Sequence, residues 1–327
     1  MDGSAKEQDR VNRMHYGIVM ANLGDYADPH VATRLAQAAE EAGWEAFFVW
    51  DHLGFVWGLP SSDPWVVLSA VAVSTTRIKL GTAITPLARR RPQIVANALA
   101  SLDLLSGGRV VFGAGLGGVV EEFTAFGDPG DAKERAAMLD EGLMIVNRLW
   151  SGASVTHRGP HYAAEGVSLA PLPIQRPRIP IWIGGEGPPA LRRAARWDGW
   201  LAPATNPDGT PSMAKSPERI AEMVAEIRRH RTTDAHFEVA VDGYSEPGDP
   251  TLPRAYAAAG ATWWLESIHG RRGSLAEMLE RVGAGPQGRN EKRGPHREYS
   301  GAGIATYGVK ERKSQMVRPV AEMNGNR

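Results

Sequence analysis

The stretch "FFVWDHLGF", from Phe47 to Phe55, says most about how this 327-residue sequence folds. It begins with a run of large apolar residues, which is typical of a strand buried on both faces. Asp51 and His52 follow immediately, and burying an acid and an imidazole is costly unless both are satisfied. Barrels of parallel strands place their chemistry at the carboxyl ends of the strands, so this stretch points to such a fold.

The segments on either side repeat the same pattern, an apolar run followed by an amphipathic helix. Strands are predicted, in chain order, at 15–20, 46–50, 78–85, 110–115, 179–185, 199–204, 237–244 and 261–267. Helices are predicted at 29–43, 64–76, 91–106, 132–150, 188–197, 217–231, in the segment after residue 250, and at 274–283.

These eight strand–helix units predict the fold class. Continuous apolar strands that alternate with helices form a parallel sheet covered by helices, which is an α/β architecture. Eight units within about 270 residues predict a (β/α)8 TIM-like barrel. A short hairpin insertion around Gly159-Pro160 is expected at 151–180, between the fourth and fifth units. The alternative is a doubly wound open sheet, which usually has fewer units and often divides into two domains.

The character of the chain changes after residue 286. Residues 287–327 contain no Leu, Phe or Trp and carry nine Lys or Arg against four Glu. A segment with so little to bury is expected to be disordered. We therefore predict a barrel domain at 14–286 and a basic, disordered tail at 287–327. The tail could touch nucleic acid or anionic lipid, but a solvated extension is the simpler interpretation.

The overall composition argues against several classes of protein. Lys plus Arg and Asp plus Glu both number 37, whereas a general nucleic-acid binder should carry a basic excess. Cysteine is absent, so disulfides and thiolate metal sites are ruled out, and no metal site is predicted. The first 13 residues are polar, and no run of about 18 apolar residues exists. We expect a soluble, cytoplasmic protein that binds neither nucleic acid nor membranes.

Asp51 and His52 are the candidate catalytic residues. At the end of the second predicted strand they should face the mouth of the barrel. There a histidine can exchange a proton, and a neighbouring acid can fix its tautomer. The alternative is structural, with Asp51 capping the next turn and His52 packing against its neighbours.

A glycine-rich stretch, "GAGLGG" at 113–118, follows the fourth predicted strand and fits G-x-G-x-x-G. A Rossmann nucleotide site is disfavoured, because the stretch lies in the fourth unit and no long helix opens at its third glycine. The remaining interpretation is a loop that lets a planar ligand approach the backbone, with Gly115 and Gly117 as candidate contacts.

Three further features lie at the same predicted face. Gly184 and Gly185 end the fifth strand ahead of a helix start, where backbone amides suit a phosphate; a tight turn is the alternative. Arginines follow the third strand, at 89–91, and the eighth strand, at 271–272. Both clusters could hold an anionic cofactor or substrate, although basic clusters in loops are more often solvated.

Taken in order, these segments resemble the luciferase-like monooxygenase family. That family includes bacterial luciferase, flavin-dependent monooxygenases and dehydrogenases that use a deazaflavin, coenzyme F-420. The resemblance runs from about residue 15 to residue 286. It is carried by "FFVWDH", "LGTAITPLARRRP", "SLDLLSGGRVVFGAGLG", "EEFTAFG", "ERAAMLDEGLMIVNRLWSG", "PRIPIWIGGEGPPALRRAARWDGW" and "AGATWWLES".

The resemblance implies a barrel that binds reduced FMN or the deazaflavin across its strand ends. Asp51 and His52 match the acid–histidine pair beside the coenzyme ring. The family often has a non-prolyl cis peptide after the third strand, which falls here near Ala83 and Ile84, where it would support the ring from behind.

Two other matches and one departure bear on the substrate. Gly184 and Gly185 match the loop that holds the coenzyme phosphate, and Trp57 is placed to wall the pocket. The sugar-phosphate dehydrogenases of the deazaflavin branch carry a glutamate in the loop after the fourth strand. Gly118 stands at that position here, with two glutamates, 121 and 122, a turn later. The departure puts the sugar-phosphate reaction in doubt.

Together these features predict a homodimeric oxidoreductase. It would move hydride or oxygen between FMN or the deazaflavin and a small organic substrate. A non-catalytic carrier or sensor is the alternative, and it would bind the coenzyme without turnover. A Rossmann dehydrogenase would instead bind NAD tightly and show no flavin-type absorbance.

Overall fold

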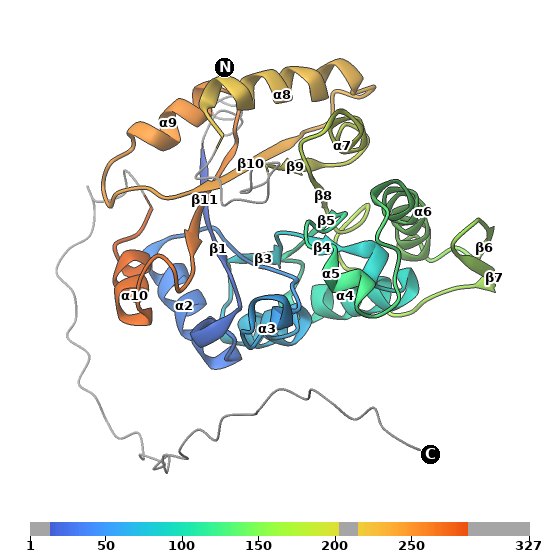
Figure 1. The fold of residues 1–327 in the computed structure, drawn as a ribbon, viewed down its shortest axis with the longest axis horizontal. Helices are drawn as coiled ribbons and strands as arrows, with labels where there is room; N and C mark the ends of the chain where they lie inside the picture. Colours follow the sequence, from blue (N-terminus) through green and yellow to red (C-terminus); the bar gives the residue numbers. More distant parts are fainter. Residues whose placement is uncertain (1–13, 203–214, 287–327) are drawn as a thin grey trace, which may run out of the picture. The chain divides into compact units, whose positions relative to one another are not determined.

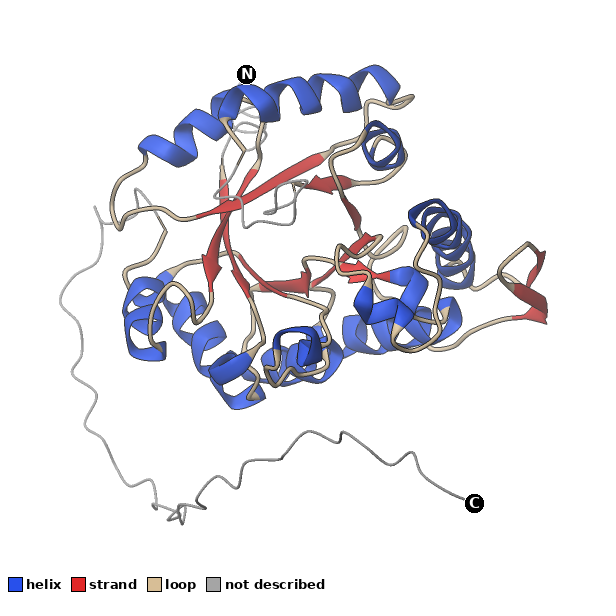
Figure 2. Cartoon of the chain, in the orientation of Figure 1, coloured by secondary structure: helices blue, strands red, loops and turns tan. Residues whose placement is uncertain are grey.

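The computed structural model describes residues 14–202 and 215–286, and the strands in these ranges close into a ring (Figure 1 and Figure 2). Neighbouring strands are parallel, in the order β3-β2-β1-β11-β10-β9-β8-β5, and β3 also pairs with β5. They are β1 (His15–Met20), β2 (Ala46–Val49), β3 (Lys79–Thr82), β5 (Val110–Gly115), β8 (Ile181–Gly184), β9 (Gly199–Leu201), β10 (Glu238–Gly243) and β11 (Trp263–Ile268). The closing pair confirms the predicted eight-stranded barrel and rules out the open sheet.

Helices follow the strands and cover the outside of the ring (Figure 2). Aspartates cap α2, α3 and α6, where a side-chain oxygen accepts a backbone amide hydrogen bond, a contribution of about 1 kcal/mol each. The helices are α2 (Pro29–Ala42), α3 (Pro64–Ser74), α4 (Pro92–Ser106), α5 (Glu121–Thr124), α6 (Ala132–Trp150), α7 (Pro188–Ala194), α8 (Pro217–His230), α9 (Thr251–Ala258) and α10 (Leu275–Gly283). Short 3-10 turns are η1 (Gly24–Tyr26), η2 (Gly54–Trp57) and η3 (Leu87–Arg89).

Alternate strand positions fill the inside of the barrel. The interior cluster consists of Val19, Ala46, Phe48, Val111, Trp182, Leu201, Ala240, Trp263 and Leu265. The opposite strand faces pack against the helices in a larger cluster. Burying each large side chain contributes about 1.5–3 kcal/mol, so both layers hold the strand ends firmly. Trp50, Ala83 and Ile84 pack on the interior cluster while staying partly exposed, and we call these three residues the apolar floor.

An antiparallel hairpin lies between α6 and β8. Its strands are β6 (Val155–Arg158) and β7 (Ala163–Val167). A short turn joins the two strands, in which the amide of Gly159 donates to the carbonyl of Tyr162 at 3.0 Å.

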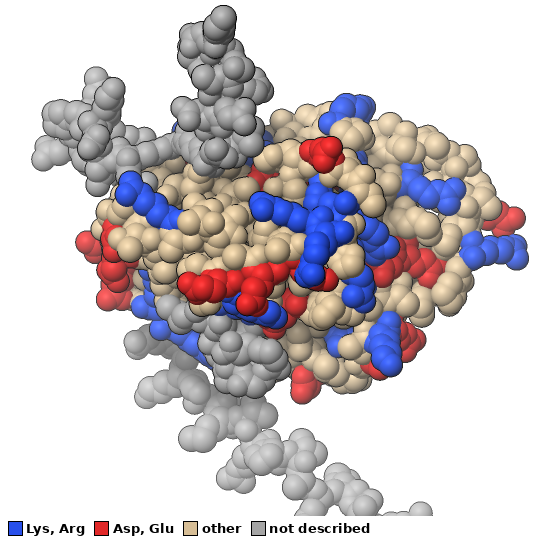
Figure 3. Space-filling view, turned by 90° about the horizontal axis from the view of Figure 1, so that it is seen from above, with Lys and Arg blue, Asp and Glu red and all other residues tan. Residues whose placement is uncertain are grey.

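Charges of both signs lie side by side on the face that carries α8 (Figure 3). Ion pairs along this helix account for part of the pattern, such as Arg219 with Glu222 at 2.7 Å. Within residues 14–202 and 215–286, none of the helices combines the length and the apolar character of a membrane span. The tail predicted for 287–327 lies outside the described residues.

Candidate active site

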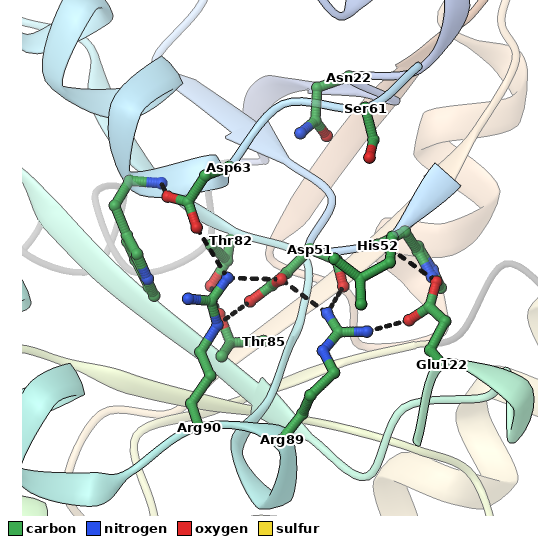
Figure 4. A network of polar contacts seen from close by, with 12 residues as sticks. Asn22, Asp51, His52, Ser61, Asp63, Thr82, Thr85, Arg89, Arg90 and Glu122 are labelled. Carbon is green, nitrogen blue, oxygen red and sulfur yellow. Dashed lines mark hydrogen bonds and ion pairs between the residues drawn. The ribbon is translucent and has the colours of Figure 1, made fainter. Parts of the chain in front are cut away.

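Asp51 lies two residues after the end of β2, and two arginines enclose its carboxylate (Figure 4). Nε of Arg90 donates to Oδ2 at 2.8 Å, and Nη2 donates to Oδ1 at 2.8 Å, which makes a bidentate pair. Nη2 of Arg89 donates to Oδ1 at 2.7 Å and to the Asp51 carbonyl at 2.6 Å. The Asp51 side chain is 1% exposed, so its charge is buried and fully paired.

His52 turns away from Asp51. Its Nδ1 lies 2.8 Å from Oε1 of Glu122, the second residue of α5. Successive residues of a strand and its direct continuation project to opposite sides, so Asp51 and His52 do not bond each other. Our expectation that Asp51 orients the imidazole is therefore wrong, and Glu122 orients it instead.

Arg89 connects the two carboxylates. While Nη2 holds Asp51, Nη1 donates to Oε2 of Glu122, and the backbone amide of Leu53 donates to Oε1 of Glu122 at 2.9 Å. Both oxygens of Glu122 thus accept hydrogen bonds, as those of an ionised carboxylate must, and Nδ1 of His52 carries the shared proton. In the neutral imidazole this leaves Nε2 as the free acceptor, on a side chain that is 24% exposed.

The arginines after the third strand form part of the scaffold. Burial acts to lower the pKa of Arg90, but the hydrogen bonds and charge of Asp51 outweigh it and raise this pKa above its ordinary value. Arg90 also contacts Asp63 at 3.2 Å and lies over the ring of Trp65. Arg89 and Arg90 are therefore engaged by carboxylates and not free for an anion, whereas Arg91, the third arginine of the cluster, is exposed.

Two tryptophans flank the imidazole. Trp50 and Trp57 each meet the ring of His52 edge to face, with ring centroids 5.5 and 5.1 Å apart. Trp50 belongs to the apolar floor, whereas Trp57 ends η2 and is 38% exposed. Trp57 thus lies beside His52, and its role as a pocket wall remains a prediction.

The peptide bond between Ala83 and Ile84 is cis, at the position that the resemblance implied. The side chain of Ile84 lies against the backbone of Gly115 and Gly184. A Cβ at Gly115 would come 2.2 Å from Cδ1 of Ile84, and one at Gly184 would come 2.7 Å from Cγ2. Four of the predicted coenzyme contacts thus lie together, and the packing of Ile84 is sufficient to explain both glycines. Contact with a coenzyme remains a prediction for all four.

The two other glycines predicted to contact the coenzyme lie in turns. Gly117 packs closely against Phe123, since a Cβ there would come 3.0 Å from the ring. Gly185 has a φ of +127°, which only glycine adopts readily, and its carbonyl accepts from Nε1 of Trp200 at 2.6 Å. The helix after it, α7, starts with two prolines, which have no N–H to offer a phosphate. The backbone of the loop at 184–187 would therefore have to make any contact with a phosphate here.

In the loop after β5, Gly118 stands where the resemblance implied a glutamate in the sugar-phosphate dehydrogenases. At Gly118, no described atom lies within 4 Å of where a Cβ would stand. Glu121 is exposed, and Glu122 is buried in the contacts to Arg89 and His52.

Two candidate functional residues, Glu122 and Asp242, were not predicted from the sequence. Glu122 gave only a weak signal, because it is one of two adjacent glutamates that precede Phe123 in a short segment. Asp242 had a clearer one, because it alternates with Ala240 in "FEVAVDGY" and so faces the same side of its strand. Whether these alternate residues face the inside or the outside of the barrel became known only with the fold.

The family described as luciferase-like monooxygenase matches residues 13–293. The F420-dependent glucose-6-phosphate dehydrogenase of Microbacterium testaceum is 37% identical over 164 residues, 48% of this chain and 47% of its own length. The F420-dependent hydroxymycolic acid dehydrogenase of Mycobacterium tuberculosis is 35% identical over 197 residues, 58% of this chain and 52% of its own length. The chain therefore spans about half the length of these curated relatives.

Solved structures share the fold at low identity. An F420-dependent secondary alcohol dehydrogenase, in complex with an F420-acetone adduct, superposes with a TM-score of 0.68 at 18% identity, covering 82% of this chain and 96% of that chain. The F420-dependent tetrahydromethanopterin reductase of Methanopyrus kandleri gives 0.66 at 20% identity, covering 83% and 97%. At this identity the likeness shows the barrel fold.

Proposed function

The chain belongs to the luciferase-like monooxygenase family, and from that premise we propose that it is an oxidoreductase. It transfers hydride between a small organic substrate and a deazaflavin or flavin bound in the barrel mouth. One observation carries the proposal: His52, oriented by the buried Glu122, lies beside the partly exposed apolar floor. A proton-exchanging group next to an apolar surface is what a planar redox ring requires of its protein.

The residues present fit such a ring. Trp50, Ala83 and Ile84 offer it an apolar surface at the carboxyl ends of the strands. Gly115 and Gly184 border Ile84, and we propose that these glycines and the loops holding Gly117 and Gly185 line the coenzyme. When bound, the coenzyme supplies the hydride chemistry, and the side chains orient it and exclude water.

His52 holds a proton at a defined atom. Glu122 keeps Nδ1 in its donating role, so Nε2 can take or give the second proton at the edge of the coenzyme ring. Asp51 acts one step further away, by fixing Arg89, which in turn fixes Glu122.

Between the two coenzymes we favour the deazaflavin, because the curated relatives named above are F420-dependent. FMN is the second candidate and leads to monooxygenase chemistry. We do not extend the glucose-6-phosphate activity of one relative to this chain, since neither Gly118 nor the engaged Glu122 supplies a free acid.

Coenzyme retention followed by turnover tests the proposal. Full-length protein is incubated separately with oxidised deazaflavin, FMN and NAD, desalted, and examined by absorbance. We expect the deazaflavin, or FMN, to stay bound. The reduced coenzyme is then offered oxygen and a panel of carbonyl compounds, and reoxidation that depends on the protein marks an enzyme. Retention without such reoxidation would favour the carrier, and retention of NAD alone would contradict the proposal.

We also propose a homodimer formed through the outward face of α3 and α4. Val66 and Val73 on α3 are 60% and 69% exposed, and Ile94 on α4 is 64% exposed. Helix α3 is apolar on all sides, as helices covered from both sides are. Light scattering should show a dimer that Val73→Lys combined with Ile94→Lys converts to a monomer. Val167→Lys, at an exposed valine of β7, is the control and should leave the dimer intact.

A cytoplasmic location is likewise our proposal, and fractionation of cells that produce the full chain tests it.

A further inference from the structure

Asp242 is an acid on the inner side of the barrel. It lies on β10 two residues after Ala240, a member of the interior cluster, so both side chains project inward. It stands near the carboxyl end of its strand, the end that forms the mouth. Among inward-facing positions of the described strands, Lys79 and Glu238 carry charge near the amino-terminal end, and Asp242 carries it near the mouth.

The strand register places Asp242 opposite the apolar floor. Alternate strands contribute the side chains of one layer, and the layer of Asp242 contains Val19, Ala83 and Gly184. Strands β10 and β3 lie four places apart in the ring of eight, so Asp242 faces Ala83 across the barrel. Ala83 and Gly184 fill little space and do not block the Asp242 carboxyl group. This group is therefore directed at the side of the mouth where we place the coenzyme.

Asp242 has few polar partners within the described residues. Oγ of Ser267, on β11, donates to its Oδ2 at 3.2 Å. Lys215 acts on it through its charge, but the ammonium pairs directly with Glu186 at 2.8 Å. Burial raises the pKa of Asp242 to about 7, and the Ser267 hydrogen bond and the Lys215 charge offset only part of this. The side chain nevertheless retains some exposure to solvent. A carboxyl group of this kind can both take and release a proton near neutral pH.

The other charged and titratable groups nearby belong to neighbouring strand ends. Tyr244, which directly follows β10, has its pKa raised, mainly by burial, and the charge of Asp242 contributes. His269, after β11, has its pKa lowered by burial and then by Arg272 and Arg271. Arg272 forms an ion pair with Glu266. None of these groups forms an ion pair or hydrogen bond with Asp242 in the described chain, so the carboxyl is held by Ser267 and remains available to a ligand.

We propose that Asp242 is a catalytic residue that exchanges a proton with the hydroxyl group of the substrate, and that the substrate is an alcohol. The proposal rests on the proposed function and extends it to a substrate class. On oxidation, the carbinol C–H bond breaks and its electron pair leaves as hydride to the oxidised deazaflavin or flavin. The O–H bond breaks, its proton passes to the Asp242 carboxylate, and the C=O bond forms. His52 would give the proton that a bound coenzyme ring requires on reduction, so two protein groups would serve the two proton transfers.

The charge of Asp242 also limits what the substrate carries at this point. An ionised carboxylate in a poorly solvated mouth repels an anion, so the hydroxyl-bearing part of the substrate is uncharged. The reverse reaction takes a ketone or aldehyde of the same kind, and the protonated Asp242 then gives its proton to the new hydroxyl.

Asp242→Asn tests the assignment, because asparagine keeps the shape and can still accept from Ser267. Full-length protein is given oxidised deazaflavin, or FMN, with propan-2-ol, cyclohexanol and benzyl alcohol in turn, and the reverse reaction is run with the matching carbonyl compounds. We expect the variant to bind the coenzyme with unchanged affinity and to lose roughly 10²–10⁴-fold in turnover. The wild-type pH–rate profile should show a limb near neutral pH that the variant lacks.

Ser267→Ala supplies an independent measurement should the first variant fail to fold. It removes a hydrogen bond that lowers the pKa of Asp242, so it should keep most turnover and move the limb to higher pH. Full turnover in Asp242→Asn, or an unmoved limb in Ser267→Ala, would overturn the assignment. So would bound coenzyme with no turnover of any alcohol or carbonyl compound. Failure of the wild type to bind either coenzyme would instead refute the proposed function itself.

Discussion

Nδ1 of His52 and Oε1 of Glu122 lie 2.8 Å apart although 70 residues separate them in the chain. The contact joins the segment after β2 to the helix after β5, and Arg89 stabilises it by binding both Glu122 and Asp51. A histidine whose tautomer is fixed by a buried carboxylate is prepared for proton exchange rather than merely packed.

Glu122→Gln tests this relationship. The neutral amide no longer forces Nδ1 to donate and no longer pairs with Arg89, so turnover should fall by about 10- to 100-fold, the size found for partners that orient a functional histidine. The bound coenzyme should be retained. Steady-state rates per folded molecule provide the measurement, and Glu121→Gln, on the exposed neighbour, is the matched control. Equal rates in both variants would return Glu122 to a purely structural role.

Asp51→Asn should act on stability more than on turnover. It removes the charge that two arginines share in a site that is 1% exposed, and breaking such a buried pair costs about 3–5 kcal/mol. Urea denaturation measures the loss. Asp63→Asn is the control, since Asp63 also contacts Arg90 but is 44% exposed, and it should cost less than about 1 kcal/mol. Matching losses in the two variants would refute the anchoring role of Asp51.

Gly184→Ala separates two explanations for this glycine. The added Cβ would come 2.7 Å from Ile84, so the single variant should lose stability and coenzyme affinity. Adding Ile84→Ala removes the clash and should restore stability. Coenzyme affinity in the double variant, measured by fluorescence titration, then decides between them. If the coenzyme affinity of the double variant recovers to that of Ile84→Ala alone, the glycine serves only to make room for Ile84. We expect the affinity to stay low, because the coenzyme approaches the backbone here.

Asp242 should make stability depend on pH in a predictable direction. Its folded pKa of about 7 exceeds the value of about 3.9 in unfolded chains, so the native state binds more protons between these values. Its stabilising effect is therefore complete below about pH 4 and is lost as pH rises to about 7. Asp242→Asn does not titrate, so its melting temperature relative to wild type should be a few °C higher at pH 8 than at pH 5. A difference independent of pH would contradict this.

The fold was predictable because its signals are local. The bounds of β1, β5 and α6 agree with the predicted ones, since continuous apolar runs and terminal Asp, Pro and Gly mark them in the sequence itself. The strand predicted at 78–85 is interrupted at the cis peptide after Ala83, a feature that side-chain periodicity does not encode. Only the family resemblance indicated it.

The site was predictable only in part, because its contacts are distant in sequence. Adjacency suggested that Asp51 serves His52, but neighbouring residues of an extended chain face opposite ways. The true partner, Glu122, and the arginine that holds it are brought together by the closing of the barrel. Sequence spacing cannot show such contacts, whereas the strand-end position that made Asp51 and His52 candidates follows from the fold alone.

The most direct test of the central claim is the turnover of His52→Ala with bound coenzyme. We measure coenzyme affinity by fluorescence titration, and then the rate of coenzyme oxidation or reduction at saturation, per folded molecule. The apolar floor and the glycine loops remain in this variant, so affinity should stay within about threefold of wild type, well under 1 kcal/mol. The rate should fall by roughly 10²–10⁴-fold. A variant that folds, binds the coenzyme and turns over at the wild-type rate would contradict the catalytic role of His52 and favour a coenzyme carrier.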